Sequence, residues 1–229
     1  MVIVEYEDIK KPVLSIKEAL VEGRWKLDGT EPFSMGDIEE GFKSCDHTLE
    51  GELNMGGQFH FALEPLSSRV HPIEDGYEVS ATTQWASEVQ AAIAQVLDTE
   101  VSSVNISVRR IGGGFGGKIS RCSLVASAAA LCAWKTRCPV RMTLTLNEAM
   151  ALTGGREPFL AKYKVGFGSN GRLMALDLDF ITDGGFTRNE VAALIGTLWL
   201  PSAYSCPNIM VRPGTVTTNT AANTFMRCP

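Results

Sequence analysis

A glycine-rich run, RRIGGGFGGKISR at residues 109–121, constrains this chain more than any other feature. It places five glycines around one phenylalanine, Phe115. Before it, the segment VSSVNISVRRI alternates so that Val104, Ile106 and Val108 share one face, which predicts a strand. After it, ISRCSLVASAAALCAWKT is rich in alanine and predicts a helix over residues 119–136. The sequence therefore predicts a glycine-rich loop with few side chains at a strand-to-helix junction.

Such a loop is suited to hold a ligand. Glycines let the main chain approach a ligand closely, and a helix start supplies N–H groups and a positive dipole end. The run is not a phosphate-binding G-x-x-x-x-G-K-[ST] loop, because Ile119 follows the lysine. A G-x-G-x-x-G pattern through Gly112, Gly114 and Gly117 is weak evidence for a dinucleotide. A flexible turn is the alternative, but five glycines around Phe115 favour a cofactor loop.

Composition excludes several classes of protein. The chain has 229 residues and a net charge of -5 without a lysine-rich run, so nucleic acid is not an expected partner. Its N-terminus is acidic and no apolar run reaches membrane-spanning length, which predicts a cytoplasmic protein without membrane contact. Its six cysteines form no C-x-x-C pair, so neither a zinc ribbon nor an iron–sulfur cluster is predicted within it.

The remaining segments predict an α+β fold with mixed strands and helices. Ser15 and Glu18 stand at capping-box spacing at the start of a short helix. A second helix, SEVQAAIAQVL, has Ser87 as its expected cap. Its expected buried face consists of Val89, Ile93, Val96 and Leu97.

A hairpin and a linker complete this pattern. Two alternating segments flank Ser169-Asn170-Gly171, which predicts a hairpin because asparagine and glycine tolerate positive φ. The polar stretch 27–37 is the expected linker.

Four segments carry a more specific signal. They are GGQFHFALEP (56–65), VRRIGGGFGGKISR (108–121), TGGREPFLAKYKVGF (153–167) and TNTAANTFMR (218–227). In this order they resemble successive segments of the molybdenum-binding region of the xanthine dehydrogenase and aldehyde oxidase family. The resemblance spans nearly the whole chain and is closest to aldehyde oxidase.

This resemblance implies an internal fragment of a molybdenum hydroxylase. Residues 1–30 would be the end of a preceding hammerhead-like domain and a linker, and residues 31–229 the first part of the molybdopterin-binding domain. The cofactor would be molybdopterin with molybdenum, and FAD, 2Fe-2S clusters and the general-base glutamate would lie outside this chain. The full-length enzyme would be a homodimer that oxidises small molecules with oxygen taken from water, and the fragment alone would be inactive.

The resemblance also assigns site residues. Gln58 matches a glutamine beside the molybdenum, and Gly114, Phe115 and Gly116 match the loop that bears on the cofactor. Arg227 matches an arginine near the cofactor, although Cys228-Pro229 departs from the glycine-rich continuation of the family. Gln58, Phe115 and Arg227 are thus expected near the metal, which the pterin rather than the protein would hold.

Two further positions bear on the substrate. Purine-oxidising members have a glutamate and an arginine where this chain has Ile119 and Ile195. Two apolar side chains in their place predict an aldehyde as the main substrate. N-heterocycles are the additional substrate class. A purine hydroxylase of the xanthine dehydrogenase type and an inactive truncated product are the alternatives.

Other polar residues are interpreted as structural. His47, His60 and His71 are isolated in sequence and are expected to be hydrogen-bonded rather than metal ligands. Asp177 and Asp179 share a strand face, which predicts a solvated surface rather than a catalytic carboxylate pair.

Overall fold

The computed structural model describes residues 3–7, 9–27, 32–188, 193, 196–197, 200 and 204–226. The chain forms two compact units. The first unit comprises Met1–Gly56 and Glu157–Ala222, and the second comprises Gly57–Arg156 and Asn223–Pro229. Each unit combines helices with a sheet, which confirms the predicted α+β class. The predicted boundary near residue 30 stays a prediction.

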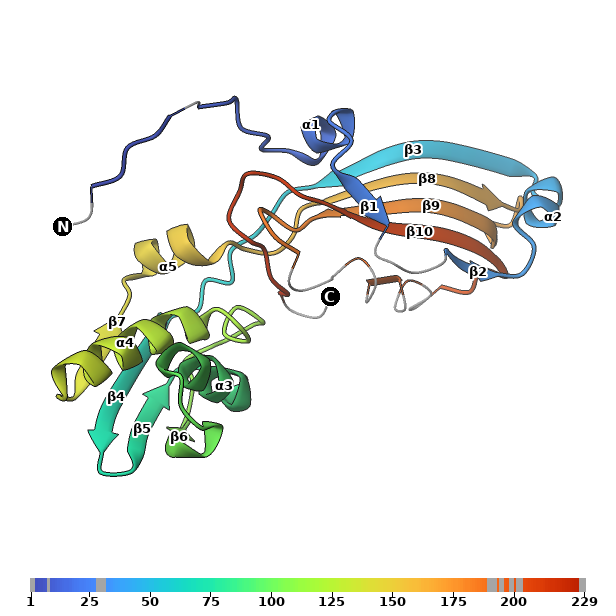
Figure 1. The fold of residues 1–229 in the computed structure, drawn as a ribbon. Helices are drawn as coiled ribbons and strands as arrows, with labels where there is room; N and C mark the ends of the chain where they lie inside the picture. Colours follow the sequence, from blue (N-terminus) through green and yellow to red (C-terminus); the bar gives the residue numbers. More distant parts are fainter. Residues whose placement is uncertain are drawn as a thin grey trace. The chain divides into compact units, whose positions relative to one another are not determined.

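The first unit is built on a curved sheet whose strands run in the order β1-β10-β9-β8-β3, with β2 also paired to β10 (Figure 1). The helices α1 (Ile16–Val21) and α2 (Ile38–Lys43) belong to this unit. Apolar side chains of α1, with Val13, pack on Leu160, Ile181 and Val216 of the sheet. The strands are β1 (Trp25–Leu27), β2 (Phe33–Met35), β3 (His47–Met55), β8 (Phe159–Phe167), β9 (Leu173–Asp183) and β10 (Asn208–Val216).

Two local predictions hold in this unit. The Ser15 side chain accepts the Glu18 N–H at the start of α1. Strands β8 and β9 pair antiparallel across the predicted hairpin, where Gly171 has φ +78°. The Asp46 carboxylate accepts the Ser169 N–H at 2.6 Å and so holds the turn. The stretch predicted as a linker contains β2, which pairs with β10.

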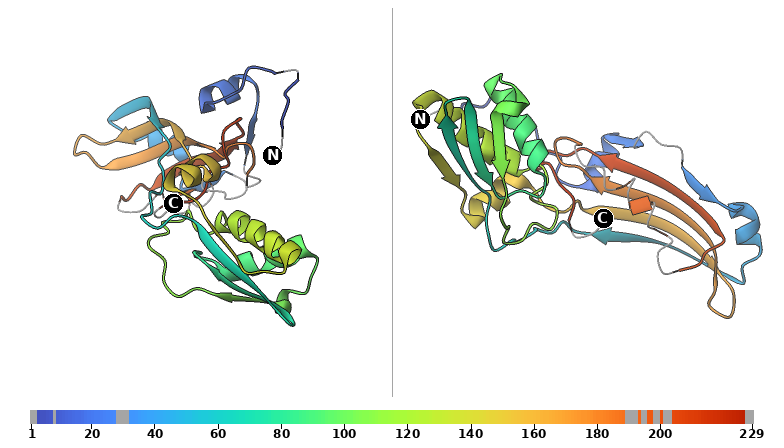
Figure 2. Two further views of the ribbon diagram at one scale, coloured as in Figure 1. Left: turned by 90° about the vertical axis from the view of Figure 1, so that its left-hand side faces the viewer. Right: turned by 90° about the horizontal axis from the view of Figure 1, so that it is seen from below.

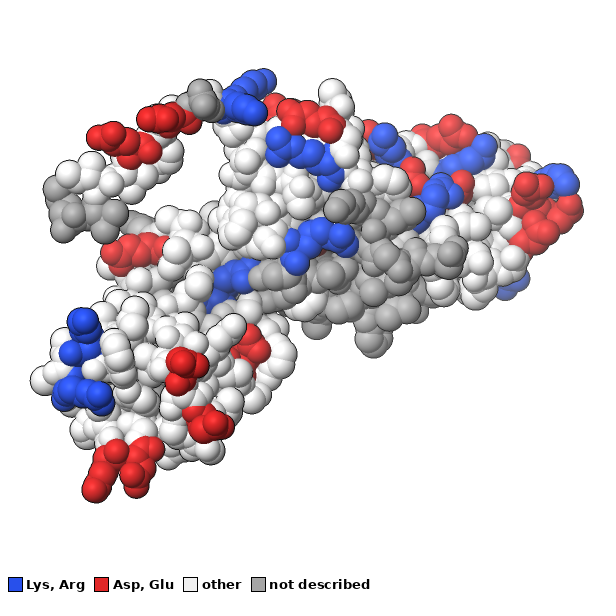
Figure 3. All heavy atoms as spheres, in the orientation of Figure 1, with Lys and Arg blue, Asp and Glu red and all other residues white. Residues whose placement is uncertain are grey.

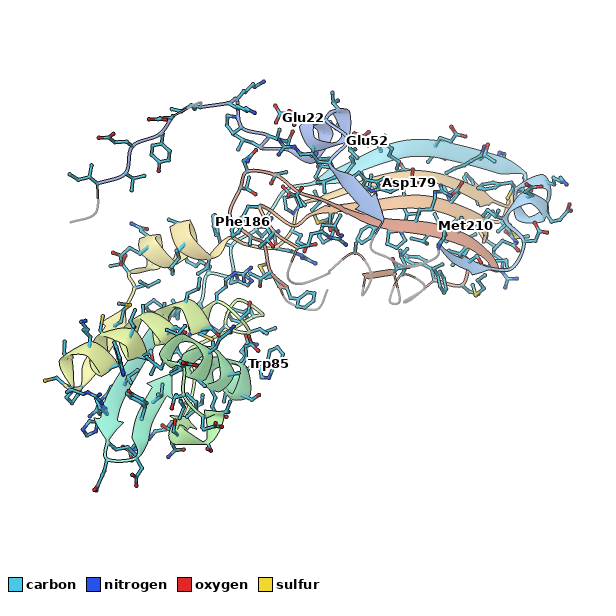
Figure 4. The ribbon with its side chains drawn as sticks, in the orientation of Figure 1. Glu22, Glu52, Trp85, Asp179, Phe186 and Met210 are labelled. Atoms are coloured by element: carbon cyan, nitrogen blue, oxygen red, sulfur yellow. The ribbon has the colours of Figure 1, made fainter. Side chains whose placement is uncertain are left out.

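Oppositely charged side chains alternate across one face of the first unit's sheet (Figure 3). Arg212 on β10 bonds Asp179 at 2.6 Å and Asp177 at 2.5 Å. Lys164 pairs with Glu50 at 2.9 Å in the neighbouring strands. Glu52 and Asp179, labelled in Figure 4, belong to this face. Asp177 and Asp179 therefore serve as partners of an arginine on a solvated face, as predicted.

The second unit is a four-stranded sheet in the order β6-β5-β4-β7, with two helices packed on one of its faces (Figures 1 and 2). Its core consists of apolar side chains from the strands and of the alanine-rich side of α4. Strands β5 and β6 are parallel because α3 crosses between them. The elements are β4 (Ser67–Ile73), β5 (Gly76–Ala81), α3 (Ala86–Leu97), β6 (Val104–Ser107), α4 (Cys122–Thr136), β7 (Val140–Thr143) and α5 (Leu146–Thr153).

The predicted cap of α3 is wrong. The helix begins two residues earlier, with Trp85 (labelled in Figure 4) as its N-cap and Ser87 inside its first turn. Thr83 accepts the Trp85 N–H at 3.0 Å instead. On the predicted buried face, Val89 and Ile93 are buried, but Val96 is 48% exposed. A twelve-residue helix that packs on one sheet face buries a narrower stripe than the prediction assumed.

Two more boundaries differ from expectation. The helix expected from residue 119 begins at Cys122, because residues 115–118 form turns first. Helix α5 was not predicted, although Thr145 and Glu148 form a complete capping box at its start. Among the described residues, no helix is both long and apolar enough to cross a lipid bilayer.

Candidate functional site

The glycine-rich loop adopts a left-handed backbone around Phe115. Gly113 has φ +96°, Phe115 φ +52° and Gly116 φ +95°. A positive φ is unfavourable for a phenylalanine because its Cβ then crowds the backbone. Phe115 is 43% exposed, so full burial of its side chain does not explain this conformation.

Close contacts with neighbouring groups of the protein explain why the loop consists mainly of glycines. A Cβ on Gly116 would overlap the Phe225 carbonyl, which closes on the loop from the C-terminal segment. The other loop glycines meet side chains in the same way. A Cβ would come to 2.6 Å from Glu64 at Gly112, from Gln84 at Gly114 and from His60 at Gly117.

Two side-chain oxygens hold the loop in place. The Glu64 Oε2 atom accepts the Gly112 N–H at 2.7 Å and the Lys118 Nζ at 2.8 Å. The Gln84 Oε1 atom accepts the Gly116 N–H at 3.0 Å and the Lys118 N–H at 3.2 Å. Each end of the loop is thereby bonded to residues outside it.

Burial would raise the pKa of Glu64, but the hydrogen bonds from Lys118 and from the Gly112 N–H outweigh it and hold this pKa below its ordinary value. Glu64 is therefore ionised at neutral pH and neutralises Lys118, whose side chain is only 3% exposed. Glu64 and Lys118 lie in two of the segments that carry the resemblance, and Gln84 lies outside them; the sequence pattern assigns no role to any of the three. Their positions depend on contacts between residues 32–54 apart in the chain.

Gln58 lies in a short three-segment pairing beside the loop. It pairs antiparallel with Arg156, and Arg156 pairs parallel with Thr224. The Arg156 N–H donates to the Gln58 carbonyl at 2.7 Å, and the Thr224 N–H donates to the Gly155 carbonyl at 2.9 Å. Because Gln58 bonds through its backbone here, its exposed side chain can engage a ligand.

The buried Arg121 ties these segments to the start of α4. It donates to the Thr153 carbonyl at 3.3 Å and to the Asn223 carbonyl at 2.9 Å. The Asn223 side chain in turn accepts the Gly155 N–H at 3.2 Å. The charge of Arg121 therefore serves to join three segments rather than to face solvent.

Parts of all four segments that carry the family resemblance thus meet within the second unit. We call this meeting point the four-segment junction, and it consists of residues 58–64, 112–121, 153–156 and 223–226. Segment 223–226 is its centre, since Thr224 pairs with Arg156 and the Phe225 carbonyl approaches Gly116.

The junction contains most of the predicted site residues. Gln58, Gly114, Phe115 and Gly116 all belong to it. Ile119 is half-buried in the turn before α4, with its N–H bonded to the Gly116 carbonyl at 3.1 Å. Arg227 and Ile195 lie outside the described residues, so their predicted roles stay predictions.

A mainly apolar pocket lies on one side of the junction. It is formed in part by Phe59, Phe61, Leu66, Leu146 and Met150, with Lys118 and Glu64 also lining it. Ile119 does not line this pocket.

His60 is hydrogen-bonded, as predicted. Its Nε2 atom lies 2.7 Å from the Phe225 carbonyl, and because a carbonyl only accepts, this nitrogen carries the proton. In the described part of the chain, no three His, Cys, Asp or Glu side chains gather as a metal site.

Sequence comparison relates the chain to molybdenum enzymes. A family model described as the molybdopterin cofactor-binding domain matches residues 25–229. Aldehyde oxidase 1 of Oryctolagus cuniculus is 40% identical over 97% of the chain, and xanthine dehydrogenase of Calliphora vicina is 38% identical over 99%. The chain spans 17% of the length of each of these relatives.

Solved structures have the same fold. Aldehyde oxidoreductase from Desulfovibrio desulfuricans superposes with a TM-score of 0.80 at 20% identity, covering 96% of this chain and 26% of that one. Quinoline 2-oxidoreductase from Pseudomonas putida 86 superposes with a TM-score of 0.79 at 20% identity, covering 97% and 30%. The resemblance stated from the four segments is confirmed.

Proposed function

We propose, from the premise that the chain belongs to the molybdopterin cofactor-binding domain family, that its four-segment junction forms part of the active site of a molybdenum hydroxylase. The observation that carries the proposal is the junction itself, where segments up to 166 residues apart place Gln58 and Phe115 in one unit. Because the chain spans 17% of its relatives, the activity belongs to the longer enzyme that contains it.

The residues of the junction fit a polar cofactor. Gln58 offers an exposed amide with both donor and acceptor atoms, and Phe115, in the same unit, offers a partly exposed aromatic ring. Bound molybdopterin supplies a molybdenum centre that exchanges electrons and oxygen with a substrate. Gln58 would hold the metal-bearing end through its amide, and Phe115 would exclude water.

Gly114 and Gly116 act through the conformation of the loop. Their Cβ positions are filled by Gln84 and by the Phe225 carbonyl, so they let the loop pack closely and keep Phe115 in place. Arg227 stays a candidate residue for binding the same cofactor.

For the substrate, we favour an aldehyde. Ile119 replaces a charge with an apolar side chain, and a purine amide buried against it without a partner would lose about 1–3 kcal/mol. An aldehyde has one carbonyl at the reacting end, and its apolar tail gains from such burial. The 38% identity to a xanthine dehydrogenase supports the second candidate, a purine hydroxylase.

The substrate is tested with the enzyme that contains this chain. We expect a higher kcat/KM for benzaldehyde than for xanthine, and the reverse order would favour the purine hydroxylase. Ile119→Glu should shift the ratio towards xanthine, whereas Ile73→Glu, at an exposed position at the end of β4, should leave it unchanged. The 229-residue chain alone should oxidise neither substrate, and turnover by the purified chain would refute this part of the proposal.

A further inference from the structure

Phe115 is held in a conformation that its own side chain disfavours. Its φ of +52° is unusual for a residue other than glycine, asparagine or aspartate. Phe115 is 43% exposed and does not belong to the hydrophobic core of the second unit. An unfavourable backbone angle at an exposed aromatic residue points to a functional constraint held by the surroundings.

The Glu64 carboxylate supplies much of this constraint. One oxygen, Oε2, bonds the Gly112 N–H before Phe115 and the Lys118 Nζ after it. The Glu64 N–H also donates to the Gly112 carbonyl at 3.2 Å, so backbone and side chain hold the same loop residue. The carboxylate therefore fixes the distance between the two ends of the loop.

Glu64 also belongs to the segment that begins with Gln58. The two are six positions apart, and His60 between them contacts Gly117 and bonds the Phe225 carbonyl. A shift of this segment would thus move both the Gln58 amide and the loop that carries Phe115.

We propose that Glu64 is a positioning residue that sets the loop and Phe115 in the conformation that receives the cofactor. This inference rests on the proposed function for its last step, the receipt of the cofactor. Its first step, the control of the loop, concerns only contacts within the second unit.

The experiment compares Glu64→Gln with Glu78→Gln. At position 64, glutamine keeps an acceptor oxygen but loses the charge that holds Lys118. Glu78→Gln is the control, because Glu78 is an exposed residue of β5 in the same unit. Hydrogen exchange of the 229-residue chain is followed by mass spectrometry in peptides covering residues 109–121 and, as an internal reference, α3 and β4. The enzyme that contains the chain is then produced in a host that makes molybdopterin, and its pterin content is measured by fluorescence after oxidative release.

Glu64→Gln leaves Lys118 buried without its counter-ion, which could unfold the unit as a whole. The double variant E64Q/K118M carries no uncompensated buried charge and is measured beside it. Loop peptides of both variants should exchange about tenfold faster, while α3 and β4 exchange as in the wild type. A purely structural role would accelerate all of these peptides together.

Four results decide the matter. Faster exchange confined to the loop, with a lower pterin content than in Glu78→Gln, supports the proposal. Unchanged loop exchange in both variants overturns it, as does faster loop exchange with unchanged pterin content. A wild-type enzyme without any pterin would refute the proposed function and with it the cofactor step, while the exchange data would still decide whether Glu64 controls the loop.

Discussion

The Glu64 Oε2 atom lies 2.8 Å from the Nζ atom of Lys118, whose side chain is only 3% exposed. A cation this deeply buried needs a counter-ion, because removal from water is costly for an unpaired charge. The same carboxylate oxygen bonds the first loop glycine, Gly112. The charge balance of the second unit and the shape of the glycine-rich loop therefore depend on one side chain.

Breaking this pair should destabilise the second unit. Glu64→Gln should lower the free energy of unfolding by about 1–3 kcal/mol, a range that allows for solvent screening because Glu64 is 35% exposed. The double variant E64Q/K118M should recover most of this loss. Urea unfolding of both variants and of Glu78→Gln provides the test, and a double variant less stable than Glu64→Gln would contradict the account.

The stabilisation by Glu64 should depend on pH. Because its folded pKa lies below the ordinary value of 4.5, the contribution is complete above that value and is lost as the pH falls through the folded pKa. The stability difference between wild type and Glu64→Gln should therefore be constant from about pH 7 to pH 5 and shrink below about pH 4. A difference that grows on acidification would show that the sign is wrong.

Two loop glycines should respond differently to an added methyl group. Gly113 and Gly116 have nearly the same φ, but a Cβ on Gly113 meets the Phe115 ring at 3.0 Å, whereas one on Gly116 overlaps the Phe225 carbonyl. Gly113→Ala should cost about 1 kcal/mol of stability from backbone strain. Gly116→Ala should cost about 3 kcal/mol or more, because backbone must move as well. Equal losses in thermal unfolding would mean that the Phe225 contact is unimportant.

Local chemistry made much of the fold predictable. The Ser15 cap and the Asn170-Gly171 turn depend on residues within three positions of one another, and both were predicted. The start of α3 was missed because Thr83 accepts the Trp85 N–H before the helix begins. The parallel pairing of β9 with β10 needs a long connection, and no local pattern specifies the strand order.

The candidate site was predictable in its parts and not in its assembly. The glycine run predicted the loop, and the resemblance of residues 56–65 to a family segment predicted Gln58 as a site residue. The return of segment 223–226 to the second unit, which brings Phe225 over Gly116, depends on contacts more than 100 residues apart. Glu64 and Gln84 also hold the loop through contacts 32–54 residues apart, which no local pattern specifies.

Gln58 should matter for turnover and not for folding. Its backbone carbonyl accepts the Arg156 N–H, and this bond survives Gln58→Ala. The free energy of unfolding should therefore change by less than about 0.5 kcal/mol. Turnover of the enzyme that contains the chain should fall about 10²–10³-fold if the amide assists the reacting centre. Gln95→Ala, at an exposed position of α3, serves as the control, and equal activity of the two variants would remove Gln58 from the site.

The central claim is that the four-segment junction takes part in holding molybdopterin. It is tested most directly by the pterin content of the enzyme that contains this chain, produced in a host that makes the cofactor, for the wild type and for Gly116→Ala. The account predicts stoichiometric pterin in the wild type and a marked loss in Gly116→Ala at a temperature where both proteins remain folded. A folded Gly116→Ala enzyme with full pterin content, or a wild-type enzyme with none, would contradict it.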